Sequence, residues 1–184
     1  ESTCSIAADF PEASQLRRCV AIQATVERKR DLIRIKEILL PEHIVLGLDG
    51  KTREEAVHAV AKTLRGDGRI ADWPLFYQTL AESDRSAQTN CELGLTIPHN
   101  RTDSVTAMVM AFGRLKAPLK TPLHEIRYVV VIGIPETMDA DYLRLVGVLM
   151  RVFRDDQLRT ALDSASSPQE VLKVFEEGET RLAH

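Results

Sequence analysis

Apolar and polar positions follow two spacings along the chain, and these predict a mixture of helices and strands. Apolar residues three and four positions apart predict four main helices, over residues 52–64, 72–80, 139–154 and 168–175. Short apolar runs bounded by turn residues predict four strands, over residues 43–48, 93–97, 106–114 and 126–134. The run 126–134 is apolar almost throughout, so we expect it at the centre of a sheet covered on both faces.

Capping residues and prolines set the expected ends of the helices. Residues 52–55 and 167–170 match the capping box, in which a hydroxyl and a carboxylate each bind the other residue's backbone N–H. Asp72 is suited to cap the second main helix, and either Thr137 or Asp139 the third. A further short helix over 35–40 is expected to stop before Pro41, because the residue before a proline disfavours helical geometry.

The alternation of helices and strands indicates an α/β fold, with a mixed β-sheet sandwiched between helices. We expect this domain to occupy residues 32–184. Residues 1–31 form a separate and partly helical extension, whose apolar residues recur at roughly helical spacing among charged ones. These apolar residues are Leu16, Val20, Ile22 and Val26. Their face packs on this domain, on a second copy in a homodimer, or on a preceding domain.

Composition narrows the class of protein. The chain has 184 residues, 44% of them hydrophobic and 28% charged, which is typical of a globular domain. The net charge of −3 gives no reason to expect nucleic acid as a partner. No apolar run approaches the roughly 20 residues that span a bilayer, and the first ten residues lack the features of a signal peptide. We therefore expect no membrane insertion.

The cysteines point to a reducing compartment. Cys4, Cys19 and Cys91 are odd in number and widely spaced, and they form no CxxC pair. This pattern argues against a disulfide framework and against a zinc site. We expect a cytoplasmic protein, or a cytoplasmic part of a larger one, that needs no metal or cofactor.

The stretch from residue 92 to residue 105 carries the candidate chemistry. Residues 93–97 are expected to form a buried strand that ends at Pro98, because proline has no N–H for the sheet. His99 then lies at the strand end, and its imidazole is a nucleophile near neutral pH, with an unperturbed pKa of about 6.5. Polar groups that can hold phosphate oxygens follow it, in Asn100, Arg101 and Thr102.

The six residues Gly94-Leu95-Thr96-Ile97-Pro98-His99 also resemble a known signature. They are similar to the active site of the fructose/mannitol-type enzyme IIA domain of the bacterial phosphotransferase system, a family that includes the nitrogen-regulatory enzyme IIA-like proteins. The resemblance runs from about residue 32 to residue 177. It implies the family's three-layer fold, a phosphohistidine at His99, and partners of the HPr-like phosphocarrier and enzyme IIB classes.

The resemblance also implies other site residues, and the chain departs from the pattern at some of them. The family's supporting arginine falls on Ser83, and Arg85, two residues away, is expected to bind phosphate in its place if the loop is displaced. In the loop before the signature, Thr89 is retained as a phosphate-binding residue while two glycines are lost. The second histidine of the family corresponds to Tyr142, whose phenol can donate a hydrogen bond but supplies no positive charge.

Two functions follow from these observations. The first is a phosphocarrier in sugar transport, in which His99 accepts a phosphoryl group from phospho-HPr and passes it to enzyme IIB or uses it as a regulatory signal. The second is a regulatory or binding domain that keeps the fold and the histidine but relays no phosphate, such as the cytoplasmic part of a transporter with a protein partner. A hydrolase with His99 as general base is set aside, because no serine or cysteine nucleophile motif accompanies it.

Overall fold

The computed structural model describes residues 34–86, 93–121 and 125–182, and for 84–86 and 182 it describes the backbone alone. The expected extension over 1–31, with its helix and its role in a homodimer, lies outside these residues.

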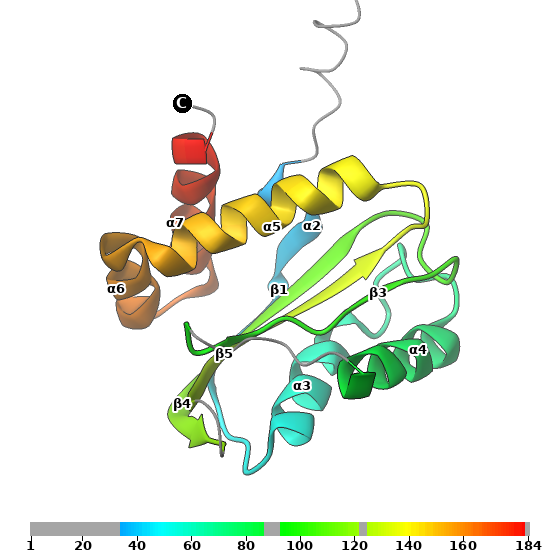
Figure 1. The fold of residues 1–184 in the computed structure, drawn as a ribbon, viewed down its shortest axis with the longest axis horizontal. Helices are drawn as coiled ribbons and strands as arrows, with labels where there is room; N and C mark the ends of the chain where they lie inside the picture. The colour runs from blue at the N-terminus through cyan, green and yellow to red at the C-terminus, as the bar shows by residue number, and fades with distance from the viewer. Residues whose placement is uncertain (1–33, 87–92, 122–124, 183–184) are drawn as a thin grey trace, which may run out of the picture. The chain divides into compact units, whose positions relative to one another are not determined.

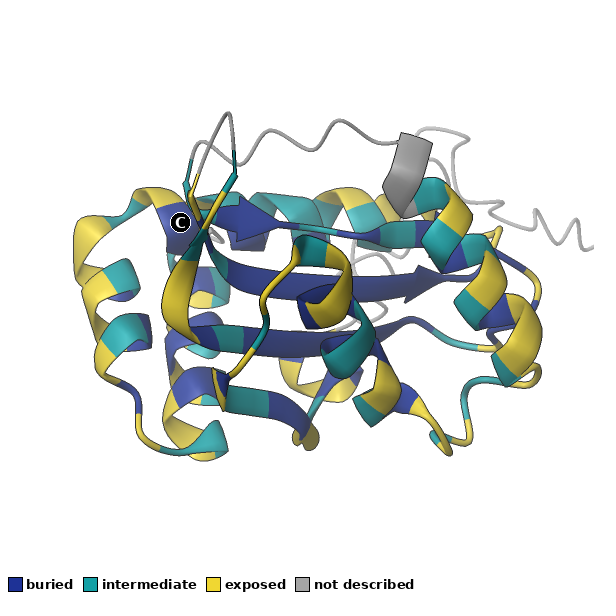
Figure 2. Cartoon of the chain, turned by 90° about the horizontal axis from the view of Figure 1, so that it is seen from below, coloured by how far each residue is buried: buried dark blue, intermediate teal, exposed yellow. Residues whose placement is uncertain are grey.

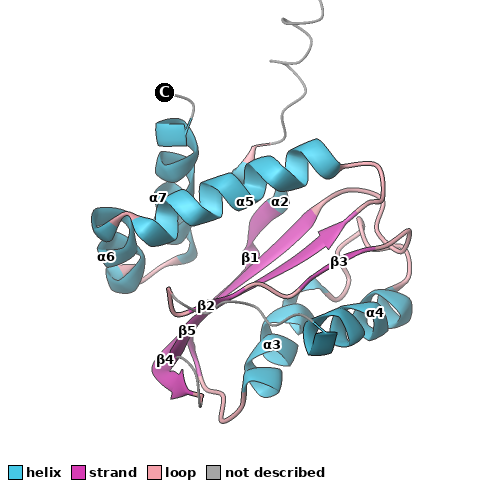
Figure 3. Ribbon diagram, viewed as in Figure 1, coloured by secondary structure: helices cyan, strands magenta, loops and turns pink. Residues whose placement is uncertain are grey.

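Five strands form one mixed sheet (Figure 3). Its order is β1 (Leu39–Leu48), β4 (Val109–Lys120), β5 (Glu125–Ile134) and β2 (Leu95–Thr96), with β3 (His99–Arg101) also paired to β5. β4 and β5 are antiparallel, whereas β1 runs parallel to β4, and β2 and β3 run parallel to β5. The predicted mixed sheet is confirmed, with β2 and β3 together along one edge.

Helices cover both faces of this sheet (Figure 1). On one face lie α3 (Arg53–Ala61), the short 3-10 helix η1 (Lys62–Leu64) and α4 (Trp73–Ser86). On the other lie α5 (Asp139–Arg154), α6 (Asp156–Ser164) and α7 (Pro168–Leu182), with α2 (Ile35–Ile38) packed against α7. The predicted three-layer arrangement is therefore confirmed.

The core has one part on each side of the sheet. Towards α3 and α4, residues such as Val60, Phe76 and Val131 are fully buried. Towards α5 and α7 the core includes a cluster of aromatic contacts, among Phe112, Tyr128, Phe153 and Phe175. The strands between these layers are buried along most of their length (Figure 2), and β5 is buried from residue 128 to residue 134, as expected for a central strand.

Two strands extend beyond their expected bounds and include prolines. Pro41 lies inside β1, which begins at Leu39 rather than at residue 43. It is tolerated because β1 is an edge strand, whose register shifts between Leu39 and Ile44. Pro118 lies inside β4, within an irregular pairing between Arg114 and Leu119. An edge or a bulge needs no N–H at the proline, so these residues remain in strands.

The helix caps agree in part with the sequence. Thr52 Oγ1 accepts from Glu55 N at 3.2 Å, and Asp72 Oδ1 accepts from Leu75 N at 3.0 Å. Glu55 reaches the N–H of Lys51 rather than that of Thr52. Neither residue proposed for the start of α5 caps it, because the N-cap is Met138 and Asp139 is already the first helical residue. Asp155, where we expected a break, ends α5 and caps α6, a helix that we did not predict.

The chain around Pro98 differs most from the expectation. The expected strand 93–97 is reduced to β2, and pairing with β5 resumes at His99 in β3. Pro98 lacks an N–H, but its carbonyl oxygen still accepts from Ile132 N at 3.0 Å, so the chain stays beside β5. His99 is therefore the first residue of β3, and not part of a turn that leaves the sheet.

Candidate functional site

His99 is held on the face of β3 that meets α5. Its half-buried ring stacks on the ring of Tyr142, with centroids 5.4 Å apart and planes at 27°. Its Nδ1 lies 2.9 Å from the carbonyl oxygen of Ile97. A carbonyl can only accept, so Nδ1 carries the hydrogen in this contact and Nε2 keeps its lone pair. Nε2 is thus the nucleophilic nitrogen of this arrangement.

The backbone around His99 is fixed from α4 and from β5. Ser83 of α4 donates from Oγ to the carbonyl oxygen of His99 at 2.7 Å. Gly94 opens the signature at a φ of +70°, which favours glycine, and its carbonyl accepts two N–H groups of β5. A Cβ at Gly133 of β5 would lie 2.7 Å from the ring of Phe76. Glycine is thus favoured at position 94 by its backbone conformation and at position 133 by the close approach of Phe76. These features let β3 pack closely between α4 and β5.

Arg101 projects from the same side of β3 as His99, because side chains two residues apart in a strand share a face. Its Nη1 lies 2.7 Å from Asp139 Oδ1, and its guanidinium carbon lies 5.8 Å from the centre of the Tyr142 ring. The side chains of Arg101 and Asp139 are 50% and 61% exposed. An ion pair so open to water contributes only about 0–1 kcal/mol. The structure therefore brings His99, Arg101 and Tyr142 together, with Asp139 as a fourth member.

The alternate residues of β3 face the opposite way. Asn100 is buried, and its Nδ2 donates to Thr79 Oγ1 at 2.6 Å and to the carbonyl of Phe76 at 3.3 Å, both in α4. Thr102 is also buried, and its hydroxyl bonds Ser104 Oγ at 2.8 Å. The Asn100 side chain thus points to α4, away from the face that meets Tyr142, whereas the Thr102 hydroxyl is bonded to Ser104. Both side chains are bonded within the fold, and their role in phosphate binding stays a prediction.

The remaining predicted phosphate-binding residues are outside the description. Thr89 is not among the described residues, and for Arg85 only the backbone in α4 is described. Sequence reasoning missed Asp139 as a partner of Arg101 and considered it only as a cap. No local pattern in the sequence indicates this pair, because it depends on β3 and β5 lying side by side with Arg101 opposite Ile134.

The electrostatics of the site are those of a neutral phenol beside a paired arginine. Burial raises the pKa of the Tyr142 hydroxyl above its ordinary value, and the charge of Arg101 offsets part of this rise. In the described part of the chain, no three His, Cys, Asp or Glu side chains are grouped to hold a metal ion. Nor is any described helix long and apolar enough to cross a membrane.

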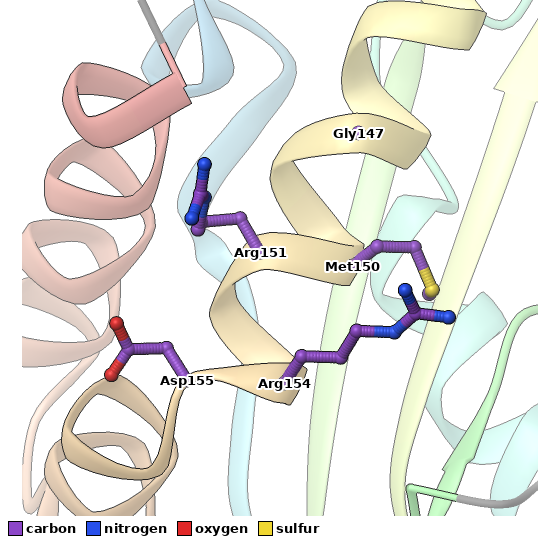
Figure 4. Close-up of a pocket in the computed structure, with 5 residues that line it drawn as sticks. All are labelled: Gly147, Met150, Arg151, Arg154 and Asp155. Atoms are coloured by element: carbon purple, nitrogen blue, oxygen red, sulfur yellow. The ribbon is translucent and has the colours of Figure 1, made fainter. Parts of the chain in front are cut away.

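A cavity of about 340 Å³ lies elsewhere, beside the C-terminal half of α5 (Figure 4). Its described lining residues are Gly147, Met150, Arg151, Arg154 and Asp155. The Asp155 carboxylate is already paired with Arg181 at 2.6 Å. None of the predicted site residues whose side chains the structure describes lines this cavity, and we treat it separately from the site at His99.

Fold and site together define an α/β domain that presents a half-buried histidine, with Nε2 available, on the edge of a mixed sheet. Residues 37–178 match the family described as "Phosphoenolpyruvate-dependent sugar phosphotransferase system, EIIA 2". The match covers well over half of the chain. The chain therefore belongs to this enzyme IIA family, and the resemblance seen in residues 94–99 is confirmed.

Individual relatives agree with this assignment. The chain is 27% identical over 131 residues to the PTS system 2-O-alpha-mannosyl-D-glycerate-specific EIIABC component of Escherichia coli; the match covers 68% of this chain and 20% of that protein. It is 27% identical over 150 residues to the PTS system fructose-specific EIIA component of Haloferax volcanii, covering 80% and 97%. The chain thus spans about a fifth of the first relative and nearly all of the second.

Solved structures share the fold. The nitrogen regulatory protein IIA-Ntr from Neisseria meningitidis superimposes with a TM-score of 0.68 at 23% identity, covering 77% of this chain and 98% of that one. The enzyme IIA mannitol in a complex with phosphorylated enzyme IIB mannitol from Escherichia coli gives a TM-score of 0.62 at 20% identity, covering 74% and 95%. At these identities the likeness is one of fold.

Proposed function

We propose that this chain is a phosphocarrier that accepts a phosphoryl group on Nε2 of His99 and passes it on. The observation that supports this best is the contact between Nδ1 and the carbonyl of Ile97, which leaves the Nε2 lone pair available. In the first transfer a bond forms from Nε2 to phosphorus as the donor phosphohistidine of an HPr-like protein loses its N–P bond. In the second, the cysteine sulfur of an enzyme IIB partner takes the phosphorus and Nε2 is released.

The side chains around His99 suit such a relay. Arg101 supplies the positive charge that a phosphoryl group of about −2 requires, and it is already within contact of the ring that stacks on His99. The face of Tyr142 keeps the imidazole in one orientation. Neither transfer needs a metal or cofactor, because both reactants are activated phosphoryl carriers and the protein only positions them.

Family membership supports the choice of partners and place. The enzyme IIA mannitol of similar fold is found in complex with phosphorylated enzyme IIB mannitol, which suggests an enzyme IIB acceptor here as well. Several relatives are sugar-specific transport components, so we propose a role in sugar transport from the cytoplasmic side. We assign this function to residues 32–184, with residues 1–31 as an extension that can also mediate a homodimer.

A second candidate function is a regulatory domain that binds a protein partner and relays no phosphate. Two features favour it: Arg101 is already paired with Asp139, and a tyrosine stands where the family has a second histidine. Both lower the positive charge available to a phosphoryl group. In that case the surface around His99, where Arg101 is paired with Asp139, would contact the partner directly.

Phosphorylation of the purified chain separates the two. The protein is incubated with phosphoenolpyruvate, enzyme I and HPr, and the label is tested for the acid lability and alkali stability of phosphohistidine. We expect one labelled residue, lost in His99→Ala and kept in His58→Ala, a half-buried histidine of α3 that is bonded to Tyr77. An unlabelled wild-type chain, beside a competent enzyme IIA, would reject the relay in favour of the regulatory domain.

A shortened chain that begins at residue 32 tests the domain assignment. It should be labelled as well as the full chain if 1–31 is only an extension. Gel filtration of both chains then shows whether the extension forms a homodimer. Loss of labelling in the shortened chain, with its fold retained by circular dichroism, would contradict the boundary.

A further inference from the structure

We propose that Asp139 is a positioning residue, which holds Arg101 before the transfer and gives it up to the phosphoryl group on His99. This inference rests on the proposed phosphocarrier function and adds an exchange of partners by Arg101. In the unphosphorylated chain Asp139 occupies the guanidinium, and in the phosphorylated chain the phosphoryl oxygens do.

The topology brings the competing carboxylate to this place. Arg101 ends β3 and pairs in register with Ile134, the last residue of the parallel strand β5. The chain then turns at Pro135 and begins α5 at Asp139, so the start of α5 returns beside the end of β3. A carboxylate in the first turn is also favoured by the helix dipole. Asp139 is therefore held at the N-terminus of α5 whether or not Arg101 contacts it.

The contact with Arg101 is weak enough to be exchanged. It is a single contact at 2.7 Å between side chains that are half exposed or more, and such pairs stabilise proteins little. A phosphoryl group offers the guanidinium two charge-assisted hydrogen bonds to an anion of about −2, which is the stronger partner. Asp139 is a monoanion in water, so we expect the phosphoryl group to displace it.

The ring of Tyr142 lies near both Arg101 and His99, so the guanidinium has only a short distance to move. The guanidinium lies 5.8 Å from the centre of its ring, and the imidazole of His99 lies 5.4 Å from the same centre. Arg101 and His99 also share one face of β3, two residues apart. The guanidinium can thus pass from Asp139 to a group on His99 by side-chain rotation, while the backbone stays paired with β5.

The test compares Asp139→Asn with Asp141→Asn. Asp141 lies in the same first turn and has the same charge, but it is not paired with Arg101. The Kd of inorganic phosphate is measured by NMR titration of the His99 imidazole. We expect Asp139→Asn to bind phosphate about fivefold more tightly than wild type, the size expected for removing one competing surface charge. Asp141→Asn should change the Kd by less than about twofold.

The same comparison is then made in an Arg101→Ala background. Here Asp139→Asn should lose its advantage over Asp141→Asn, because there is no guanidinium to release. Equal effects of the two substitutions, or an unchanged advantage without Arg101, would overturn the exchange. Labelling from phospho-HPr is followed in parallel. A chain that shows the Kd pattern but is never labelled would refute the phosphocarrier function and reduce the exchange to one between Asp139 and bound phosphate.

Discussion

Two of the aspartate–arginine pairs in the structure have opposite surroundings. Asp67 and Arg69 form a fork at 2.6–3.2 Å, with side chains 5% and 21% exposed, and Asp67 Oδ2 also bonds His43 Nε2 at 2.9 Å. Arg101 and Asp139 share a single contact at 2.7 Å and are 50% and 61% exposed. The same chemical groups are thus fixed in one place and open to solvent in the other.

The difference in burial gives the two pairs different roles. Arg69 also donates to the carbonyl oxygens of Glu37 and Met108, so its fork joins the loop after η1 to α2 and to the start of β4. Hydrogen bonds from Arg69 hold the pKa of Asp67 well below its usual range, against the opposing effect of burial. The buried pair therefore stabilises the fold, whereas the exposed pair can exchange partners at the site.

The largest predicted effect is on the buried pair. Asp67→Asn keeps the shape of the side chain but leaves the charge of Arg69 without its carboxylate. Removal of one partner from a buried pair typically costs 3–5 kcal/mol, and we expect about 3 kcal/mol because Arg69 keeps some contact with water. Urea unfolding measures this loss, with Asp139→Asn as the matched control at about 1 kcal/mol or less. Equal losses would contradict the distinction between the two pairs.

Acid titration should separate the pairs in a second way. The folded pKa of Asp67 is depressed, so its contribution is present above the ordinary value of about 4 and is lost as pH falls through the lower folded value. Between pH 5 and pH 2, wild type should therefore lose stability more steeply than Asp67→Asn, in which this group cannot titrate. Asp139→Asn should follow wild type. Urea midpoints at several pH values check this, and parallel curves for all three chains would refute it.

The central strand and several helix caps could be predicted from the sequence, because the signals for them are local. The apolar run 126–134 was recognised as a central strand, and Thr52 and Asp72 were recognised as caps, because periodicity and capping depend only on neighbouring residues. The prolines misled the prediction, because whether a strand tolerates proline depends on its place in the sheet. Pro41 is tolerated in an edge strand, and the sequence does not say which strands are edges.

The candidate site shows the same limit, because local signals do not tell which face of the sheet each side chain meets. The signature led to His99, and the resemblance placed Tyr142 beside it, as the stacked rings show. The pattern predicts all four residues 99–102 as site residues, because they follow the expected end of a strand at Pro98. Since residues 99–101 form β3, successive side chains point to opposite faces, and Asn100 is directed to α4.

Asn100 tests whether a polar residue next to His99 serves the fold alone. Asn100→Ala removes two hydrogen bonds to α4 and leaves Thr79 Oγ1 without this donor, so we expect a loss of about 2 kcal/mol in urea unfolding. The folded fraction should still be labelled at His99. Arg101→Ala is the matched control on the other face, with a loss of about 0.5 kcal/mol and impaired labelling. A stable Asn100→Ala chain without label would mean that Asn100 also serves the phosphate site.

The smallest predicted effect concerns the hydroxyl of Tyr142. Its removal tests the contribution of this polar group separately from that of the ring. Tyr142→Phe keeps the face that meets both His99 and the guanidinium of Arg101. The hydroxyl makes no hydrogen bond to another described residue, so we expect the rate of labelling to change by less than about twofold. Tyr142→His should instead speed labelling, because an imidazole can add the positive charge that a phenol lacks.

Both rates are measured by rapid quench with phospho-HPr, against Tyr77→Phe as the control for loss of a hydroxyl elsewhere. Tyr77 is half-buried in α4, on the far side of the sheet from α5, and its hydroxyl bonds His58. A rate that falls more than about tenfold in Tyr142→Phe alone would mean that the hydroxyl donates to the phosphoryl group, since that is the size of one hydrogen bond to a charged group. The weak Arg101–Asp139 pair would then share the site with a second donor, and the exchange by Arg101 would account for only part of the phosphate binding.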